Sequence, residues 1–170
     1  EEKGSLCFGV EVLGDDNVLD FYSNKEVLLA NGIGSLSGTS LRWNMALKMR
    51  DKGFVFVSVI HPSAVIAHDV ELAEGVQIMA GAIVQPGVYI GQDTIINTAS
   101  SVDHDCYIGA NCHLSPGVIL SGSVRIQGGT HVGTGCIVIN NISIGSNCLI
   151  AAGSVVFKDV SDGHILIQKK

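Results

Sequence analysis

Apolar residues recur along most of this chain with a period of six. From Ala64 to Asp159 the sequence divides into sixteen consecutive hexapeptides without an insertion, and the third residue of each is Ile, Leu or Val. An α-helix would repeat every 3.6 residues and a half-buried strand every two, so a period of six predicts short strands separated by corners. Three such strands would close one coil of a triangular β-solenoid.

Stacked coils explain how this pattern buries its apolar side chains. The third positions are Ile66, Leu72, Ile78, Val84, Ile90, Ile96, Val102, Ile108, Leu114, Leu120, Ile126, Val132, Val138, Ile144, Ile150 and Val156. Residues eighteen apart should stack at about 4.8 Å, the strand spacing of a parallel sheet. One repeat cannot bury its own face, whereas neighbouring coils form a continuous core. We therefore expect a mainly β fold with a parallel β-helix over residues 59–160.

Residues 1–58 lack this period and predict a small, Rossmann-like α/β unit. Strands are expected at Glu26–Ala30 and Phe54–Val59, with a helix at Leu41–Lys52 between them that ends at Gly53. The helix should be amphipathic.

The apolar face of this helix is expected to carry Leu41, Met45 and Leu47 with Ala46. After the first strand comes the turn Asn31–Ser35, where the glycines allow the backbone to approach a ligand closely. The chain opens on Glu1 without Met, and its α/β portion is too short for a complete doubly wound domain. We therefore expect a further strand and a first glycine-rich loop before residue 1, and a C-terminal tail at residues 161–170.

Composition narrows the choice of partners. The chain is 46% apolar but only 5% aromatic, and its 21 glycines suit a narrow prism with tight corners. The formal net charge is −6 and no basic cluster is present, which argues against nucleic acid. The longest apolar run, Phe54–Ile60, is too short to cross a bilayer, and no signal peptide opens the chain. A cytoplasmic protein that does not bind membranes is expected.

The cysteines fit the repeat. Cys106, Cys112, Cys136 and Cys148 each occupy the first place of a hexapeptide, where Val, Ala, Ser or Thr stands elsewhere. They are interpreted as small core residues and not as disulfide partners or metal ligands.

His104 is the first candidate for chemistry. It lies at a corner between Asp103 and Asp105, and a carboxylate that accepts one ring N–H raises the basicity of the other nitrogen, as a general base requires. A solvated corner with no function is about equally consistent with this spacing alone. Gly122 favours the base, because it follows by eighteen residues on the same edge and its N–H could serve as an oxyanion donor.

His113 and His131 are also eighteen residues apart and should stack on one outward face. Two imidazoles in register can bind a metal, but a zinc site needs three or four ligands. No metal is therefore expected.

Several segments of the sequence resemble those of a known enzyme family. The segments Ile96–Thr98, Val102–Cys106 and Cys112–Gly117, together with Ile60–Ala64 and Val12–Asp16, resemble the bacterial hexapeptide-repeat sugar acetyltransferases of the sialic acid O-acetyltransferase and UDP-4-amino-sugar N-acetyltransferase type.

The resemblance implies a left-handed parallel β-helix, a homotrimer and active sites between subunits. It implies that His104 is the general base, that Asp105 raises its basicity and that Gly122 provides the oxyanion N–H. Acetyl-CoA would be the co-substrate, contacted by the residues His113, Thr134 and Ala152. Gly34 and Asp103 are the residues expected to bind the acceptor, and Asp103 could also share the role of Asp105.

Three functions follow as expectations. The first is direct acetyl transfer to the amino group of a nucleotide-linked amino-sugar in surface-glycan biosynthesis. The second is O-acetylation of a sialic-acid-like sugar, which the sequence does not separate from the first. The third is a non-catalytic trimeric scaffold, in which the Asp-His-Asp corner would be coincidental.

Overall fold

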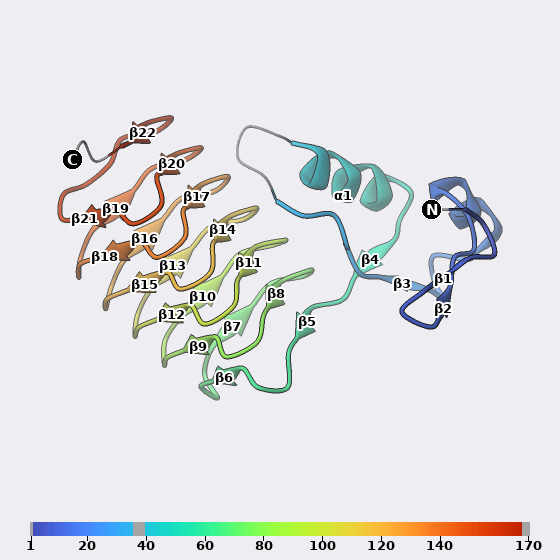
Figure 1. Cartoon of the computed structure of the whole chain (residues 1–170), viewed down its shortest axis with the longest axis horizontal. Helices are drawn as coiled ribbons and strands as arrows, with labels where there is room; N and C mark the ends of the chain where they lie inside the picture. Colours follow the sequence, from blue (N-terminus) through green and yellow to red (C-terminus); the bar gives the residue numbers. More distant parts are fainter. Residues whose placement is uncertain (1, 36–39, 168–170) are drawn as a thin grey trace.

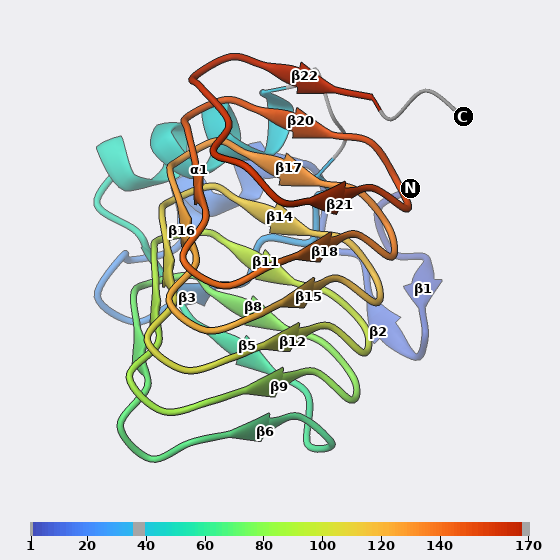
Figure 2. The ribbon, with the colours of Figure 1, turned by 90° about the vertical axis from the view of Figure 1, so that its left-hand side faces the viewer.

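The computed structural model describes residues 2–35 and 40–167, and most of them form a three-faced parallel β-solenoid (Figures 1 and 2). One sheet, the histidine face, contains β5 (Val59–Ile60), β8 (Gln77–Ile78), β11 (Ile95–Ile96), β14 (His113–Leu114), β17 (His131–Val132), β20 (Leu149–Ile150) and β22 (Ile165–Leu166). The second, the apolar face, contains β6 (Val65–Ile66), β9 (Ile83–Val84), β12 (Ser101–Val102), β15 (Ile119–Leu120), β18 (Ile137–Val138) and β21 (Val155–Val156). The third, the tyrosine face, contains β7 (Glu71–Leu72), β10 (Tyr89–Ile90), β13 (Tyr107–Ile108), β16 (Arg125–Ile126) and β19 (Ser143–Ile144).

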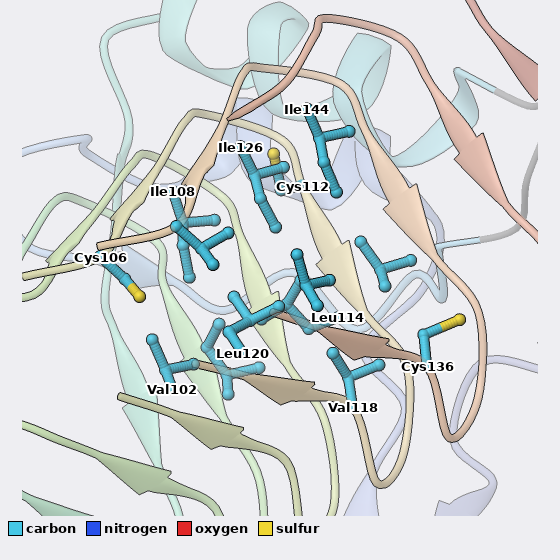
Figure 3. Close-up of a cluster of buried hydrophobic side chains, with 14 of the residues drawn as sticks. Val102, Cys106, Ile108, Cys112, Leu114, Val118, Leu120, Ile126, Cys136 and Ile144 are labelled. Carbon is cyan, nitrogen blue, oxygen red and sulfur yellow. The ribbon is translucent and has the colours of Figure 1, made fainter. Parts of the chain in front are cut away.

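The predicted eighteen-residue stacking is confirmed. Ile96 pairs with Leu114, and Val102 pairs with Leu120, each in a parallel register. From Ile78 to Val156 every third-position side chain is at most 1% exposed. These side chains meet along the prism axis (Figure 3), so the period of six is the period of the core.

Cysteines pack into the same core. Cys106, Cys112, Cys136 and Cys148 are free and buried, as predicted. Burial raises the pKa of Cys106 and Cys112 to about 11. At neutral pH these thiols are protonated and unreactive.

The corners have a shared backbone conformation. The sixth residue of most hexapeptides has a positive φ, including Asp105 at 60° and Gly87 at 73°. Glycine, Asn and Asp tolerate this left-handed conformation best, which explains their recurrence in the sixth place. The turns that join the apolar face to the tyrosine face form one edge of the prism, here called the His104 edge. Those that join the histidine face to the apolar face form the Thr134 edge.

The N-terminal residues form a smaller unit beside the solenoid (Figure 1). It consists of a hairpin of β1 (Leu6–Cys7) and β2 (Val10–Glu11), the 3-10 helix η1 (Asp16–Phe21), β3 (Leu28–Leu29), α1 (Leu41–Asp51) and β4 (Val55–Phe56). Strands β3 and β4 pair in parallel, with α1 between them in the chain. Strands and helix thus occur where the sequence predicts them.

The buried face of α1 differs from the predicted one. Ala46 is buried as predicted, but Leu41 and Leu47 are exposed, and Arg42 and Met49 are buried in their place. Ala46 and Met49 pack against Phe54 and Phe56. The apolar pattern misplaced the face because it gave no reason to bury an arginine.

A bidentate ion pair joins the two units. Arg50 on α1 contacts Asp93 at 2.6 and 3.1 Å and Glu74 at 3.0 Å. The backbone N–H of Phe56 also donates to Glu74 at 3.0 Å. Because the Asp93 carboxylate is fully buried, these contacts hold α1 against the solenoid in one orientation.

Candidate active site

His104 lies in the turn between β12 and β13, on the His104 edge. Its Nδ1 lies 2.8 Å from an Asp105 carboxylate oxygen, and its backbone N–H donates to Asp103 at 2.8 Å. A carboxylate only accepts hydrogen bonds, so Nδ1 carries the proton and Nε2 is left with a free lone pair. The predicted orientation of a general base is therefore present.

The charges around His104 increase its basicity. The hydrogen bond to Asp105 and then the charge of Asp103 raise the pKa of His104 above its ordinary value of 6.5. The ring is exposed, and it can therefore reach a ligand that lies outside its own chain.

Gly122 lies directly beside this imidazole, one coil further along the same edge. A Cβ atom on Gly122 would lie 2.6 Å from His104 Nε2 and 2.7 Å from its Cε1, closer than real contacts permit. Within the described part of the chain, no acceptor pairs with the Gly122 N–H. The corner thus combines a free imidazole nitrogen with a free backbone donor, the pair that acyl transfer requires.

On the histidine face, His113 and His131 lie in register with ring centroids 4.7 Å apart and nearly perpendicular. His113 Nε2 lies 3.0 Å from the Asn97 amide nitrogen, and His131 Nε2 lies 3.1 Å from the Ser115 hydroxyl. The amide NH₂ only donates, so His113 Nε2 accepts and its Nδ1 carries the hydrogen. Both Nδ1 atoms are buried; the backbone of Ser35 acts on the His113 ring, and Nδ1 of His131 has no hydrogen-bond partner among the described residues.

His113 is a neutral hydrogen-bond donor at physiological pH. Burial and then the neighbouring His131 lower the pKa of His113 to about 4. Burial also lowers the pKa of His131. Over the described residues, no group of three or more His, Cys, Asp or Glu side chains is placed to hold a metal ion.

A cavity of about 560 Å³ lies between the N-terminal unit and the histidine face. Its lining includes Gly34 and His113, two residues that the resemblance assigns to acceptor and acetyl-CoA respectively. Asn97 and Gln77 also line it and were missed in the sequence, although Asn97 stands at a corner sixteen residues before His113.

The predicted site residues form separate groups within one chain. His104, Asp105, Gly122 and Asp103 share the His104 edge, whereas Gly34 and His113 share the cavity on the histidine face. Thr134 and Ala152 follow β17 and β20 and lie on the Thr134 edge. The apolar face separates the two edges, so one chain does not bring these groups together.

In the described part of the chain, no helix has the length and hydrophobicity that a membrane span requires.

Comparisons with known proteins agree with the hexapeptide-repeat solenoid. The family model described as the hexapeptide repeat of succinyl-transferase matches residues 133–158. A search of curated proteins finds no match.

Solved structures match nearly the whole chain. The acetyltransferase domain of PglB from Neisseria gonorrhoeae, in complex with acetyl coenzyme A, is 31% identical with a TM-score of 0.88, over 97% of this chain and 78% of that chain. A His-to-Asn variant of perosamine N-acetyltransferase from Caulobacter crescentus, in complex with CoA and GDP-perosamine, is 40% identical with a TM-score of 0.83. The match covers 94% of this chain and 75% of that chain. WeeI from Acinetobacter baumannii shares the fold, with a TM-score of 0.72 at 23% identity. The match covers 98% of this chain and 79% of that chain.

Proposed function

The chain belongs to the bacterial hexapeptide-repeat sugar acetyltransferases, and on this premise we propose that it moves the acetyl group of acetyl-CoA to the amino group of a nucleotide-linked amino-sugar in surface-glycan biosynthesis. The observation that carries the chemistry is the position of Gly122, whose backbone leaves no room for a Cβ atom beside the free nitrogen of His104. An imidazole base beside a backbone N–H suits attack on a thioester carbonyl.

The reaction is direct transfer. The acceptor nitrogen attacks the carbonyl carbon of acetyl-CoA and forms the new C–N bond while His104 Nε2 takes its proton. The carbonyl oxygen becomes an oxyanion, which accepts a hydrogen bond from the Gly122 backbone N–H. Collapse of this intermediate breaks the C–S bond, and the thiolate of CoA leaves with the proton from His104. No covalent enzyme intermediate forms, which agrees with the burial of the four core cysteines.

An amine acceptor is favoured by similarity. The relative at 40% identity is an N-acetyltransferase with GDP-perosamine bound, and its match extends over the N-terminal unit. We place the acceptor sugar in the cavity beside Gly34. His113 lines the same cavity and would contact acetyl-CoA there.

A homotrimer would complete the site. On the apolar face, outward-pointing side chains are 38–62% exposed; they are Val65, Ile83, Ile119, Ile137 and Val155. Ser101 occupies the remaining outward position of this row, between Ile83 and Ile119. A largely apolar exposed row of this kind marks an interface. If three apolar faces surround a threefold axis, the His104 edge of each subunit meets the Thr134 edge of its neighbour. Each site would then take His104 from one subunit, and Thr134 and Ala152 from the next.

Finer points of the fold are part of this proposal. They are the left-handed sense of the solenoid, the partial Rossmann-like character of residues 1–58, and the division into residues 1–58, 59–160 and 161–170. Residues 168–170 lie outside the described residues.

Release of free CoA thiol tests the function. With acetyl-CoA present, we expect a nucleotide-linked 4-amino-sugar to drive release and the corresponding N-acetyl sugar to form. A free sialic acid serves as the second acceptor. Release driven only by the sialic acid would replace the amine with a hydroxyl acceptor. Release by neither, with acetyl-CoA still binding, would refute both acceptor assignments.

Subunit mixing tests the shared site. His104→Ala removes the base, and Ala152→Trp fills the exposed Thr134 edge, so each variant alone should be inactive. Co-expressed in equal amounts, the two should form mixed trimers in which about a quarter of the sites pair an intact His104 edge with an intact Thr134 edge. The measured rate should recover to about that fraction of wild type. No recovery in trimers shown to be mixed would place the whole site within one chain.

The pH profile tests the role of Asp105. Only neutral His104 accepts a proton, so kcat/KM should rise as pH increases through its pKa, with a midpoint above 6.5. In Asp105→Asn the carboxylate no longer stabilises the imidazolium, so the midpoint should move to lower pH. The maximal rate should fall by about 10-fold or more because the ring is less basic and less well held. Asn tolerates the positive φ of this position, so the corner is preserved. An unchanged midpoint would contradict the assignment.

A further inference from the structure

Gly87 lies on the His104 edge one coil before Asp105, eighteen residues earlier in the sequence. A Cβ atom on Gly87 would lie 2.7 Å from Oδ1 of Asp105, closer than real contacts permit. It would also lie 3.6 Å from the backbone nitrogen of Asp105 and 3.7 Å from its Cα. The Asp105 carboxylate therefore occupies the space that a side chain at position 87 would need.

The two oxygens of this carboxylate have different neighbours. Oδ1 lies over Gly87, whereas Oδ2 lies 2.8 Å from His104 Nδ1 and accepts its proton in a hydrogen bond. The two oxygens belong to one planar group, so a displacement of Oδ1 also moves Oδ2. The hydrogen bond to His104 therefore depends on the open space at Gly87.

Backbone hydrogen bonds fix the position of Asp105 over this turn. The Asp105 N–H donates to the Pro86 carbonyl at 3.0 Å, and the Gly87 N–H donates to the Asp69 carboxylate at 3.1 Å. Because the backbone of Asp105 is anchored to the turn that contains Gly87, it cannot move away from an added Cβ atom. The carboxylate would have to rotate instead.

The same arrangement holds a second carboxylate in this chain. A Cβ atom on Gly75 would lie 2.5 Å from Oδ1 of Asp93, one coil further on, and Arg50 binds both oxygens of Asp93. Other sixth-place glycines are followed eighteen residues later by Ala or Gly, and a Cβ on them would meet open space; they are Gly81, Gly117 and Gly135. A glycine below an aspartate thus leaves room for the carboxylate to reach its partner.

We propose that Gly87 is a positioning residue of the active site, because its missing side chain leaves the space in which Asp105 is held against His104 Nδ1. This inference rests on the proposed function, which makes His104 the general base. The hydrogen bond to Asp105 is the largest of the influences that raise the pKa of His104. Asp103, whose charge also raises this pKa, accepts the backbone N–H of His104 instead.

Gly87→Ala tests the inference with and without turnover. NMR titration of the histidine-labelled full chain, with His104→Ala to assign the signal, should show a lower pKa for His104 than in wild type. The midpoint of kcat/KM should move to lower pH in parallel, and kcat should fall by about 10-fold because the ring is less well held. Gly87→Asn should give the same shifts, since it also adds a Cβ, but it should be the more stable variant because Asn tolerates the φ of 73° better.

Gly129→Ala is the matched control. Gly129 has a φ of 75°, and its added Cβ would meet the side chain of Asn147, one coil further on. This pair lies on the edge that joins the tyrosine face to the histidine face, away from His104. The unfolding temperature should therefore fall about as far as in Gly87→Ala, while the pKa of His104 stays at its wild-type value and kcat stays within about twofold.

The outcomes separate this inference from the proposed function. An unchanged pKa of His104 in folded Gly87→Ala and Gly87→Asn would overturn it. An equal shift in Gly129→Ala would show a general distortion of the solenoid and overturn it as well. In the Asp105→Asn background Gly87→Ala should add little to the shift, so additive shifts would also contradict it. A shift confined to the Gly87 variants would support it even if neither acceptor drives CoA release, because the titration requires no turnover.

Discussion

His104→Ala should reduce kcat for acetyl transfer by about 10²- to 10⁴-fold, the usual contribution of a positioned general base. The ring is exposed and packs only at a corner, so the variant should keep the wild-type unfolding temperature and acetyl-CoA affinity. Turnover by CoA thiol release and binding by calorimetry would separate these effects. Loss of turnover with binding intact is the signature of a base.

His68 provides a matched control for this variant. It is exposed on the same His104 edge, two coils earlier, but among the described residues no ion pair joins its ring to a carboxylate. His68→Ala should therefore leave kcat within about twofold of wild type, since surface substitutions away from a site have small effects. If His104→Ala retained more than half of the wild-type rate, the scaffold function would account better for the chain.

Gly122→Ala should reduce kcat by about 10-fold or more without loss of the fold. The three heavy atoms nearest to the added Cβ all belong to His104, with Nε2 at 2.6 Å, Cε1 at 2.7 Å and Cδ2 at 3.3 Å. The backbone of Gly122 has no unusual φ, so alanine is accommodated and the imidazole is what must move. A displaced base loses its alignment with the acceptor, and small misplacements of this kind are costly in rate.

A double-mutant cycle identifies the cause. In the His104→Ala background the Cβ of Ala at position 122 has no ring to displace, so the second substitution should add little to the loss of kcat. Rates of the wild type, both single variants and the double variant complete the cycle. Additive losses would show that Gly122→Ala acts on something other than the position of His104.

Much of the solenoid follows from local rules. The hexapeptide period leads to two-residue strands, and it places Ile96 on Leu114 and Val102 on Leu120, as observed. The same spacing predicts that Gly122 lies beside His104, as observed. In a solenoid, residues eighteen apart in the chain are neighbours in space, so distances along the sequence convert directly into contacts.

In the N-terminal unit, distances along the sequence do not convert into contacts in this way. Its strands and helix were predicted, but the buried face of α1 was not, because Arg42 is buried by the loop it supports through hydrogen bonds to the carbonyls of Asn31 and Ile33, and not by an apolar neighbour. Arg50 and Asp93 are 43 residues apart, and no period relates them. Contacts between a helix and a solenoid depend on the three-dimensional path of the linking chain.

The sequence by itself determined the repeat, the core, the burial of the cysteines and the corner formed by His104, Asp105 and Gly122. All of these depend on interactions within one coil or between adjacent coils, whose spacing is constant along the chain. The tertiary structure alone decided that Gly34 and His113 share a cavity, and that Arg42 is buried without a carboxylate partner behind its loop. These features arise where two units of different periodicity pack together. Their contacts are set by the shapes and charges of both surfaces, which no single pattern along the chain encodes.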